Sequence, residues 1–235
     1  MRRLSRTALA ILVVAACAAP VAGGAQDRHG PRGGPLVAPA QGGGMTGGEL
    51  LGEAWVRGLS LPAENPFSGR CITLVDKVLA PQIGEDGTAT CSASPGSKLL
   101  VFFGSFCTNY EAPLFPQTEA EQLACAIAGD QAIHEINITV DGGETINIVQ
   151  PRFEVSSPQR TVQLPPDNVL GAPAGPATVT AHAWAAVIRK LRPGQHTIAE
   201  EVAADFGTGE ERFTLTTFLN IVPRGHSHGE QDDDQ

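Results

Sequence analysis

The chain has 235 residues, of which 27 are Gly and 18 are Pro, and this density of turn-forming residues disfavours an architecture of long helices. Hydrophobic residues make up 42% of the chain, which is enough for one core of ordinary size and argues against wholesale disorder. The formal net charge of −9 disfavours a nucleic acid as partner, because its phosphate backbone would be repelled.

The first 25 residues have the pattern of a secretory signal peptide. Three arginines within the first six residues form a basic start, and the apolar run over residues 8–16 is too short to span a bilayer. Cys17 follows Val-Ala-Ala, which resembles a bacterial lipobox, so we expect lipidation of Cys17 and a membrane anchor at that point only. The alternative is cleavage near residue 25, in which case Cys17 is discarded with the leader and the protein is secreted.

Two segments lack the apolar residues that would offset the entropy of ordering them. Residues 26–48 are rich in Gly and Pro, which predicts a disordered linker. Residues 224–235 form a polar, acidic tail that we also expect to be disordered. Within this tail His226 and His228, with nearby carboxylates, are candidate ligands of a weak metal site, and a merely solvated tail is the alternative.

The remaining residues, 49–223, are predicted to form one domain made of short strands between turns. Residues 98–103 are a continuous apolar run after a turn, and residues 136–140 and 145–149 alternate around the turn at 141–144. A second hairpin is expected to join a strand at 197–203 to one at 212–222 through a Gly-containing bend. The pattern favours an antiparallel β-sandwich of immunoglobulin-like or jelly-roll type.

One short α-helix is expected to interrupt the strands. Thr118 and Glu121 have the spacing of a capping box, in which each residue satisfies a backbone N–H of the other. Leu123, Ala124 and Ile127 would form the buried stripe of this helix. The acidic residues at its start are explained by the helix dipole rather than by catalysis.

Four cysteines follow Cys17, and an even number in an exported chain predicts two disulfides. Three pairings are possible. Closure between nearest neighbours favours Cys71 with Cys91 and Cys107 with Cys125. No Cys-x-x-Cys pair is present, so a zinc site formed by these residues is disfavoured.

The segment Leu-Arg-Pro-Gly-Gln-His-Thr-Ile at residues 191–198 resembles the start of the last two strands of many bacterial immunoglobulin-like domains. More widely, the chain resembles an uncharacterised family of exported bacterial proteins over residues 53–222. The residues that carry this resemblance include Trp55, Cys71, Cys91, Cys107, Cys125, Trp184 and the Pro-Gly-x-His-Thr-Ile segment. The resemblance implies export and a β fold, and it implies no activity. The chain departs from the family at residues 181–184, where members tend to have Asp-Gly-Tyr-Trp, which places in doubt any site built from those aromatics.

Three side chains are weighed as ligand-binding or catalytic groups. His182 and Trp184 lie two residues apart, so they share one face of a strand, where an exposed Trp could stack on a sugar ring. Burial of Trp184 in the core is the favoured alternative. His196 follows a Pro-Gly turn, and a bond from its ring to a backbone carbonyl, locking the corner, is favoured over a role as general base.

Two functions from different classes fit these observations. The first is an exported, membrane-anchored envelope protein, monomeric and without a cofactor, whose β-sandwich binds an unidentified ligand or envelope component or has a structural role. The alternative is an extracellular hydrolase of carbohydrate, which needs two carboxylates about 5 to 10 Å apart in one cleft. Glu200 and Glu201 are adjacent in a strand and so point to opposite faces, which excludes them as such a pair.

Overall fold

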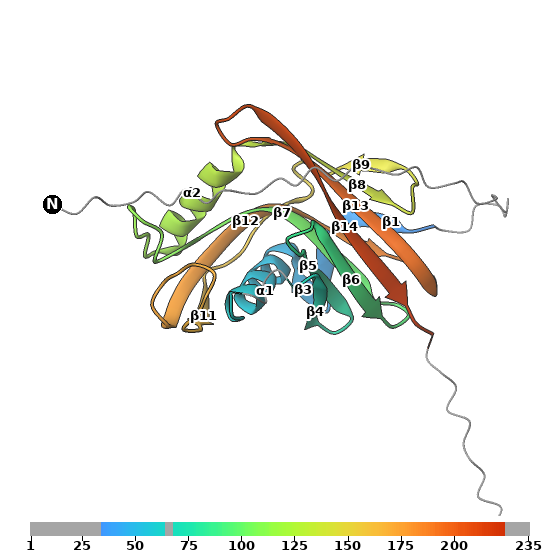
Figure 1. Cartoon of the computed structure of the whole chain (residues 1–235), viewed down its shortest axis with the longest axis horizontal. Helices are drawn as coiled ribbons and strands as arrows, with labels where there is room; N and C mark the ends of the chain where they lie inside the picture. Colours follow the sequence, from blue (N-terminus) through green and yellow to red (C-terminus); the bar gives the residue numbers. More distant parts are fainter. Residues whose placement is uncertain (1–33, 64–67, 224–235) are drawn as a thin grey trace, which may run out of the picture. The chain divides into compact units, whose positions relative to one another are not determined.

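The computed structural model describes residues 34–63 and 68–223, which fold as a mainly β domain with two helices (Figure 1). The helices are α1 (Gly47–Leu59) and α2 (Glu119–Asp130). The strands are β1 (Leu36–Pro39), β2 (Gln41–Gly42), β3 (Met45–Thr46), β4 (Arg70–Val75), β5 (Val78–Gln82), β6 (Thr88–Ala93), β7 (Lys98–Thr108), β8 (Ile133–Val140), β9 (Thr145–Asn147), β10 (Glu154–Ser156), β11 (Arg160–Leu164), β12 (Gly175–Arg189), β13 (Gly194–Asp205) and β14 (Glu210–Ile221).

Twelve of the strands form one hydrogen-bonded sheet in the order β1-β12-β7-β5-β4-β6-β14-β13-β8-β9, with β10 and β11 also paired to β12. The hairpins β8–β9 and β13–β14 are the two that the sequence predicts. The sheet is mixed, however, because β6 runs parallel to β14 and to β4, and β5 runs parallel to β7. The expectation of a purely antiparallel sheet is therefore wrong, since alternation within a strand does not reveal the direction of its neighbour.

The sheet folds over so that strands far apart in its order enclose one core. This core contains Leu99 and Val101 from β7 together with Ile136 and Ile138 from β8 and Ile198 from β13. A layered, sandwich-type arrangement is compatible with such a core. The structure leaves the immunoglobulin-like assignment as a prediction.

The described part of the predicted linker is folded. Residues 36–46 form β1, β2 and β3, and α1 begins at Gly47, so the folded domain starts well before residue 49. The glycines here serve close packing, because a Cβ on Gly48 would collide with the carbonyl oxygen of Ser156. The helix also has a capping box formed by Thr46 and Glu49, the same signal that predicts α2.

The long strand β12 is covered on both faces. On one face, Ala181 and Ala183 pack against Leu51 of α1. On the other, Thr180 and His182 are bonded to side chains of α2. Figure 1 shows the two helices on opposite sides of β12 and β7, and the three short strands β1, β10 and β11 pair end to end along one edge of β12.

Two disulfides connect these elements. Cys71 of β4 is joined to Cys91 of β6, with Cα atoms 5.2 Å apart, and Cys107 of β7 is joined to Cys125 of α2, with Cα atoms 6.0 Å apart. This is the pairing that the sequence favours. Neither helix of the described chain is long and apolar enough to cross a membrane.

Candidate functional site

The buried face of α2 is mainly polar and differs from the apolar stripe that the sequence predicts for this helix. Gln122, Ala126 and Asp130 are buried, and their spacing of four residues places them on one side of the helix. Ile127 is instead 41% exposed, and Ala124 is exposed as well. Two of the three buried residues are polar, so a search for apolar periodicity could not find this face.

Gln122 is a fully buried amide whose bonding capacity is used within the protein. Its Nε2 donates to Thr178 Oγ1 at 2.8 Å and to the carbonyl oxygen of Pro116 at 3.1 Å. Its Oε1 accepts from Thr180 Oγ1 at 3.0 Å and from Gln159 Nε2 at 3.1 Å. Such a saturated network fixes the position of α2 on β12 and the end of the segment that precedes α2.

About two helical turns after Gln122, Asp130 contacts His182, which lies between two carboxylates. The Nδ1 of His182 is 2.7 Å from Asp130 Oδ2, and its Nε2 is 3.0 Å from Glu154 Oε1. His182 and Asp130 are buried, whereas the Glu154 side chain is 49% exposed. We refer to these three residues as the His182 cluster. It ties α2, β12 and β10 together, since each contributes one member.

The environment favours the imidazolium form of His182. The hydrogen bond from the ring to Asp130 raises the pKa of His182, burial of the ring opposes this, and the hydrogen bond to Glu154 raises the pKa further. In this state both ring nitrogens donate to carboxylates. Neither nitrogen is then free to accept a proton from a nucleophile or to bind a metal.

Trp184 lies on the same face as His182, as the sequence predicts. Its ring is edge-on to the His182 imidazole with the centroids 5.6 Å apart, and the side chain is half-buried against the main core. The structure therefore brings the two candidate residues together, but it also uses them in packing. Sequence reasoning missed Asp130 and Glu154, because a single carboxylate in a helix or a short strand carries no distinguishing spacing.

The corner residue His196 is bonded as its structural interpretation predicts. Its Nε2 donates to the carbonyl oxygen of Arg192 at 2.8 Å, and its Nδ1 is 2.7 Å from Asp141 Oδ2. Asp141 also accepts from the backbone N–H of Thr197, so it fixes the β8–β9 turn to the start of β13. Burial opposes protonation, but these hydrogen bonds raise the pKa of His196.

A second buried carboxyl group, that of Glu200, belongs to β13. The residue is 5% exposed, on the core side of the strand between Ile198 and Val202, and its Oε1 has no hydrogen-bond partner. Burial raises the pKa of Glu200 to about 8. Glu201 is exposed, so the two carboxylates point to opposite faces as expected.

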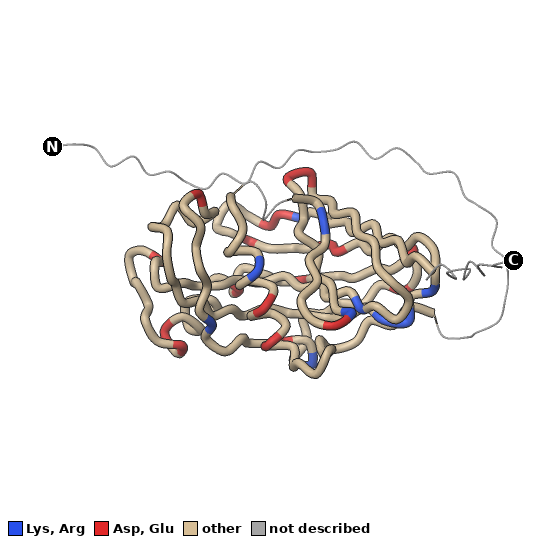
Figure 2. The backbone as a smooth tube through the Cα atoms, turned by 90° about the horizontal axis from the view of Figure 1, so that it is seen from below, with Lys and Arg blue, Asp and Glu red and all other residues tan. Residues whose placement is uncertain are grey.

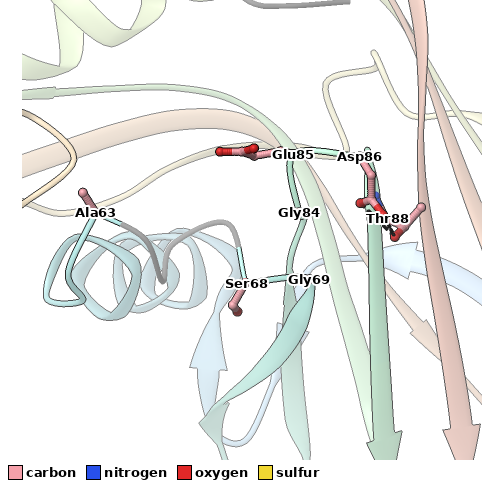
Figure 3. A pocket seen from close by; sticks show the side chains of 7 residues that line it. All are labelled: Ala63, Ser68, Gly69, Gly84, Glu85, Asp86 and Thr88. Atoms are coloured by element: carbon pink, nitrogen blue, oxygen red, sulfur yellow. Dashed lines mark hydrogen bonds between the residues drawn. The ribbon is translucent and has the colours of Figure 1, made fainter. Parts of the chain in front are cut away.

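A surface depression of about 590 Å³ beside β6 tests the hydrolase alternative. Glu85 and Asp86 line it, but Asp86 accepts from the backbone N–H and the hydroxyl of Thr88, which lowers its pKa. Figure 3 shows the Glu85 side chain extending away from Asp86, so these carboxylates do not flank one position. The geometry gives no support to glycoside hydrolysis at this place.

The described residues form neither a metal-ligand cluster nor a concentrated basic face. The described chain contains no group of three or more His, Cys, Asp or Glu residues arranged to hold a metal ion. Figure 2 shows its Lys and Arg positions dispersed rather than gathered into one face. Cys17, His226 and His228 lie outside the described residues, so the lipidation and metal predictions made for them remain predictions.

Comparisons with known proteins give no family. No protein-family model matches the chain, and no curated protein matches it. The solution structure of amebosin is similar at 12% identity over 61% of this chain and 95% of that one, with a TM-score of 0.24. The crystal structure of the cysteine protease inhibitor EhICP2 from Entamoeba histolytica is similar at 13% identity over 56% and 85%, with a TM-score of 0.22. Scores this low carry no argument about fold or function.

Proposed function

We propose that the chain is an exported module of the bacterial cell envelope that acts by binding or as a structural part. The observation that carries this proposal is the pair of disulfides, Cys71–Cys91 and Cys107–Cys125. Stable disulfides form in oxidising compartments and are rare in the cytosol of mesophiles. They fit the basic and apolar leader at the start of the chain.

The same proposal has three further parts. The chain is anchored through a lipid on Cys17, it is monomeric, and its domain is a β-sandwich related to bacterial immunoglobulin-like domains. The leader sequence supports the anchor, and the core enclosed by distant strands supports the sandwich.

The bonding of the His182 cluster supports a binding or structural role over a catalytic one. Both ring nitrogens of His182 are engaged by Asp130 and Glu154, and Gln122 is saturated by its neighbours. A general base needs a free ring nitrogen within reach of the proton that it removes. The cluster is better suited to holding α2 in place.

Metabolic labelling tests export and anchoring together. The full-length chain is expressed in a bacterium with labelled palmitate, beside a Cys17→Ala variant, and the cells are fractionated. We expect label and membrane association for the natural chain only. Unlabelled mature protein that begins near Gln26 in the medium would contradict the anchor and leave export standing.

The disulfides are tested on the protein isolated from the same cells. Alkylation before and after reduction, followed by mass spectrometry, should show two links with the stated pairing and no free thiol among these four cysteines. Retention in the cytosol with four alkylated thiols would overturn the proposal.

A further inference from the structure

The segment between β7 and α2 presents two large apolar side chains to solvent. Leu114 is 73% exposed and Phe115 is 52% exposed, the two highest values among the large hydrophobic residues of the described chain. Soluble proteins often expose single apolar residues, whereas contiguous exposed apolar surface marks interaction sites. We call residues 111–117 the apolar loop.

The apolar loop is held in one conformation from within. The backbone N–H of Phe115 donates to the carbonyl oxygen of Glu111 at 2.7 Å, and Gln117 Nε2 donates to the carbonyl oxygen of Phe115 at 2.7 Å. Phe115 has a φ of 43°, a conformation that bulky side chains rarely adopt. These hydrogen bonds compensate for the strained backbone and keep the Phe115 side chain at the surface.

Neighbouring elements fix both ends of the loop. The disulfide Cys107–Cys125 brackets it by joining β7 to α2. Buried Gln122 donates to the carbonyl oxygen of Pro116, and Gln159 Nε2 donates to that of Gln117 at 3.1 Å. A loop ordered before it binds loses little conformational entropy on binding, which is the advantage of preorganised recognition loops.

The charged residues of the loop and of the start of α2 indicate the kind of partner. No Lys or Arg occurs between Lys98 and Arg152, whereas exposed Glu111 lies in the loop and exposed Glu119 follows it in α2. An anionic lipid surface would repel these carboxylates. A protein pocket that is apolar inside and bordered by Lys or Arg would complement both the apolar tip and its acidic flanks.

We propose that the apolar loop is the recognition element of this module and that it binds a protein partner through an apolar pocket with a basic rim. Leu114 and Phe115 are the anchors that enter the pocket. This inference rests on the proposed function, because it names the surface through which an exported binding module would act.

Site-specific photocrosslinking in the bacterium that encodes the chain tests the proposal. A benzophenone amino acid replaces Phe115 in the full-length chain, and Phe218, which is 46% exposed on β14, is replaced in the matched control. We expect one discrete protein adduct from position 115, none from position 218, and loss of the adduct when Leu114→Ser is added. Mass spectrometry then identifies the partner for purification.

Calorimetry with the purified partner measures how much each substitution changes the affinity. Leu114→Ser should weaken binding at least tenfold, whereas Phe218→Ser should change it less than twofold. Because the rim is basic, raising the salt from 50 to 500 mM should weaken binding as well. Equal effects of the two substitutions, or affinity that does not change with salt, would overturn the proposal.

Vesicles of phosphatidylethanolamine and phosphatidylglycerol distinguish a lipid surface from a protein pocket. A Leu114→Trp variant should show no blue shift of its fluorescence on addition of these vesicles, and such a shift would overturn the proposal in favour of membrane insertion. A chain that is exported and disulfide-bonded but gives no adduct at position 115 would refute the role of the loop alone. Retention in the cytosol would refute the proposed function itself.

Discussion

The two helices cover opposite faces of β12 with different chemistry. On the α1 face, Leu51 is fully buried against Ala181 and Ala183, and the contact is apolar. On the α2 face, Gln122 and Asp130 are bonded to polar residues of β12, and a disulfide adds a covalent link. One strand thus combines a face whose packing depends on shape and area with a face whose packing depends on hydrogen bonds between polar groups, although Asp130 Oδ1 on that face has no partner.

The largest expected effect comes from breaking the polar face. His182→Ala removes the partner of buried Asp130, so we expect a loss of about 3 to 5 kcal/mol in the free energy of unfolding, measured in urea. Glu154→Gln, at a half-exposed carboxylate, is the control and should cost much less. A cost below about 1 kcal/mol for His182→Ala would show that the cluster does not hold α2.

Shortening a buried side chain on the apolar face should leave a cavity and so lower the free energy of unfolding. Leu51→Ala removes a fully buried side chain, and we expect a loss of about 3 kcal/mol at any pH between 5 and 8. Val169→Ala, at a side chain that is 37% exposed, is the matched control with an expected loss below about 1 kcal/mol. A strong dependence of the Leu51→Ala cost on pH would contradict the division between the two faces.

Like Asp130 on the α2 face, Glu200 is a buried carboxyl group with one unpartnered oxygen, its Oε1, but it lacks a histidine partner such as the one that Asp130 has. Its pKa is raised from 4.5 to about 8, so the unfolded chain loses this proton at lower pH and stability falls as the pH rises from 4.5 towards 8. Glu200→Gln should therefore increase the free energy of unfolding at pH 6.5 by about 2 to 3 kcal/mol and change it little at pH 4. An equal change at both pH values would show that ionisation of Glu200 does not matter.

The smallest effects are expected at the helix starts. Thr46→Ala and Thr118→Ala each remove the hydroxyl of a capping box, and each should cost about 1 kcal/mol. Because the capping geometry is the same, the two costs should agree although the faces differ. A cost above about 2 kcal/mol for only one of them would mean that this helix depends on its cap more than on its packing.

Much of the fold could be predicted from local pattern. The hairpins follow from alternation around Gly-containing turns, and the α2 capping box follows from the spacing of Thr118 and Glu121. Thr46 and Glu49 have the same spacing, but the Gly and Pro content of residues 26–48 predicts a linker there, and no helix is expected at that place. Gly48 allows a close approach to Ser156, and this approach depends on tertiary structure. The parallel pairing of β6 with β14 and β4, and of β5 with β7, also depends on tertiary structure.

The candidate site was predicted only in part. The spacing of His182 and Trp184 was enough to place them on one face, and the adjacency of Glu200 and Glu201 was enough to require one carboxyl to point inward. Asp130 and Glu154 meet His182 only because α2 and β10 converge on β12. Apolar patterning carries no information about a buried face made of polar residues.

The protonation state of His182 is the most direct test, because the raised pKa of its ring predicts an imidazolium between the two carboxylates of the polar face. Nitrogen-15 NMR of the labelled protein should show both ring nitrogens protonated below pH 6.5, with the midpoint of the titration above pH 6.5. Since the folded pKa is raised above the unfolded value of 6.5, the stability due to this cluster should be fully present below pH 6.5 and lost as the pH rises through the folded pKa. A neutral imidazole with one free nitrogen at pH 6.5 would contradict the account and would make His182 available for chemistry.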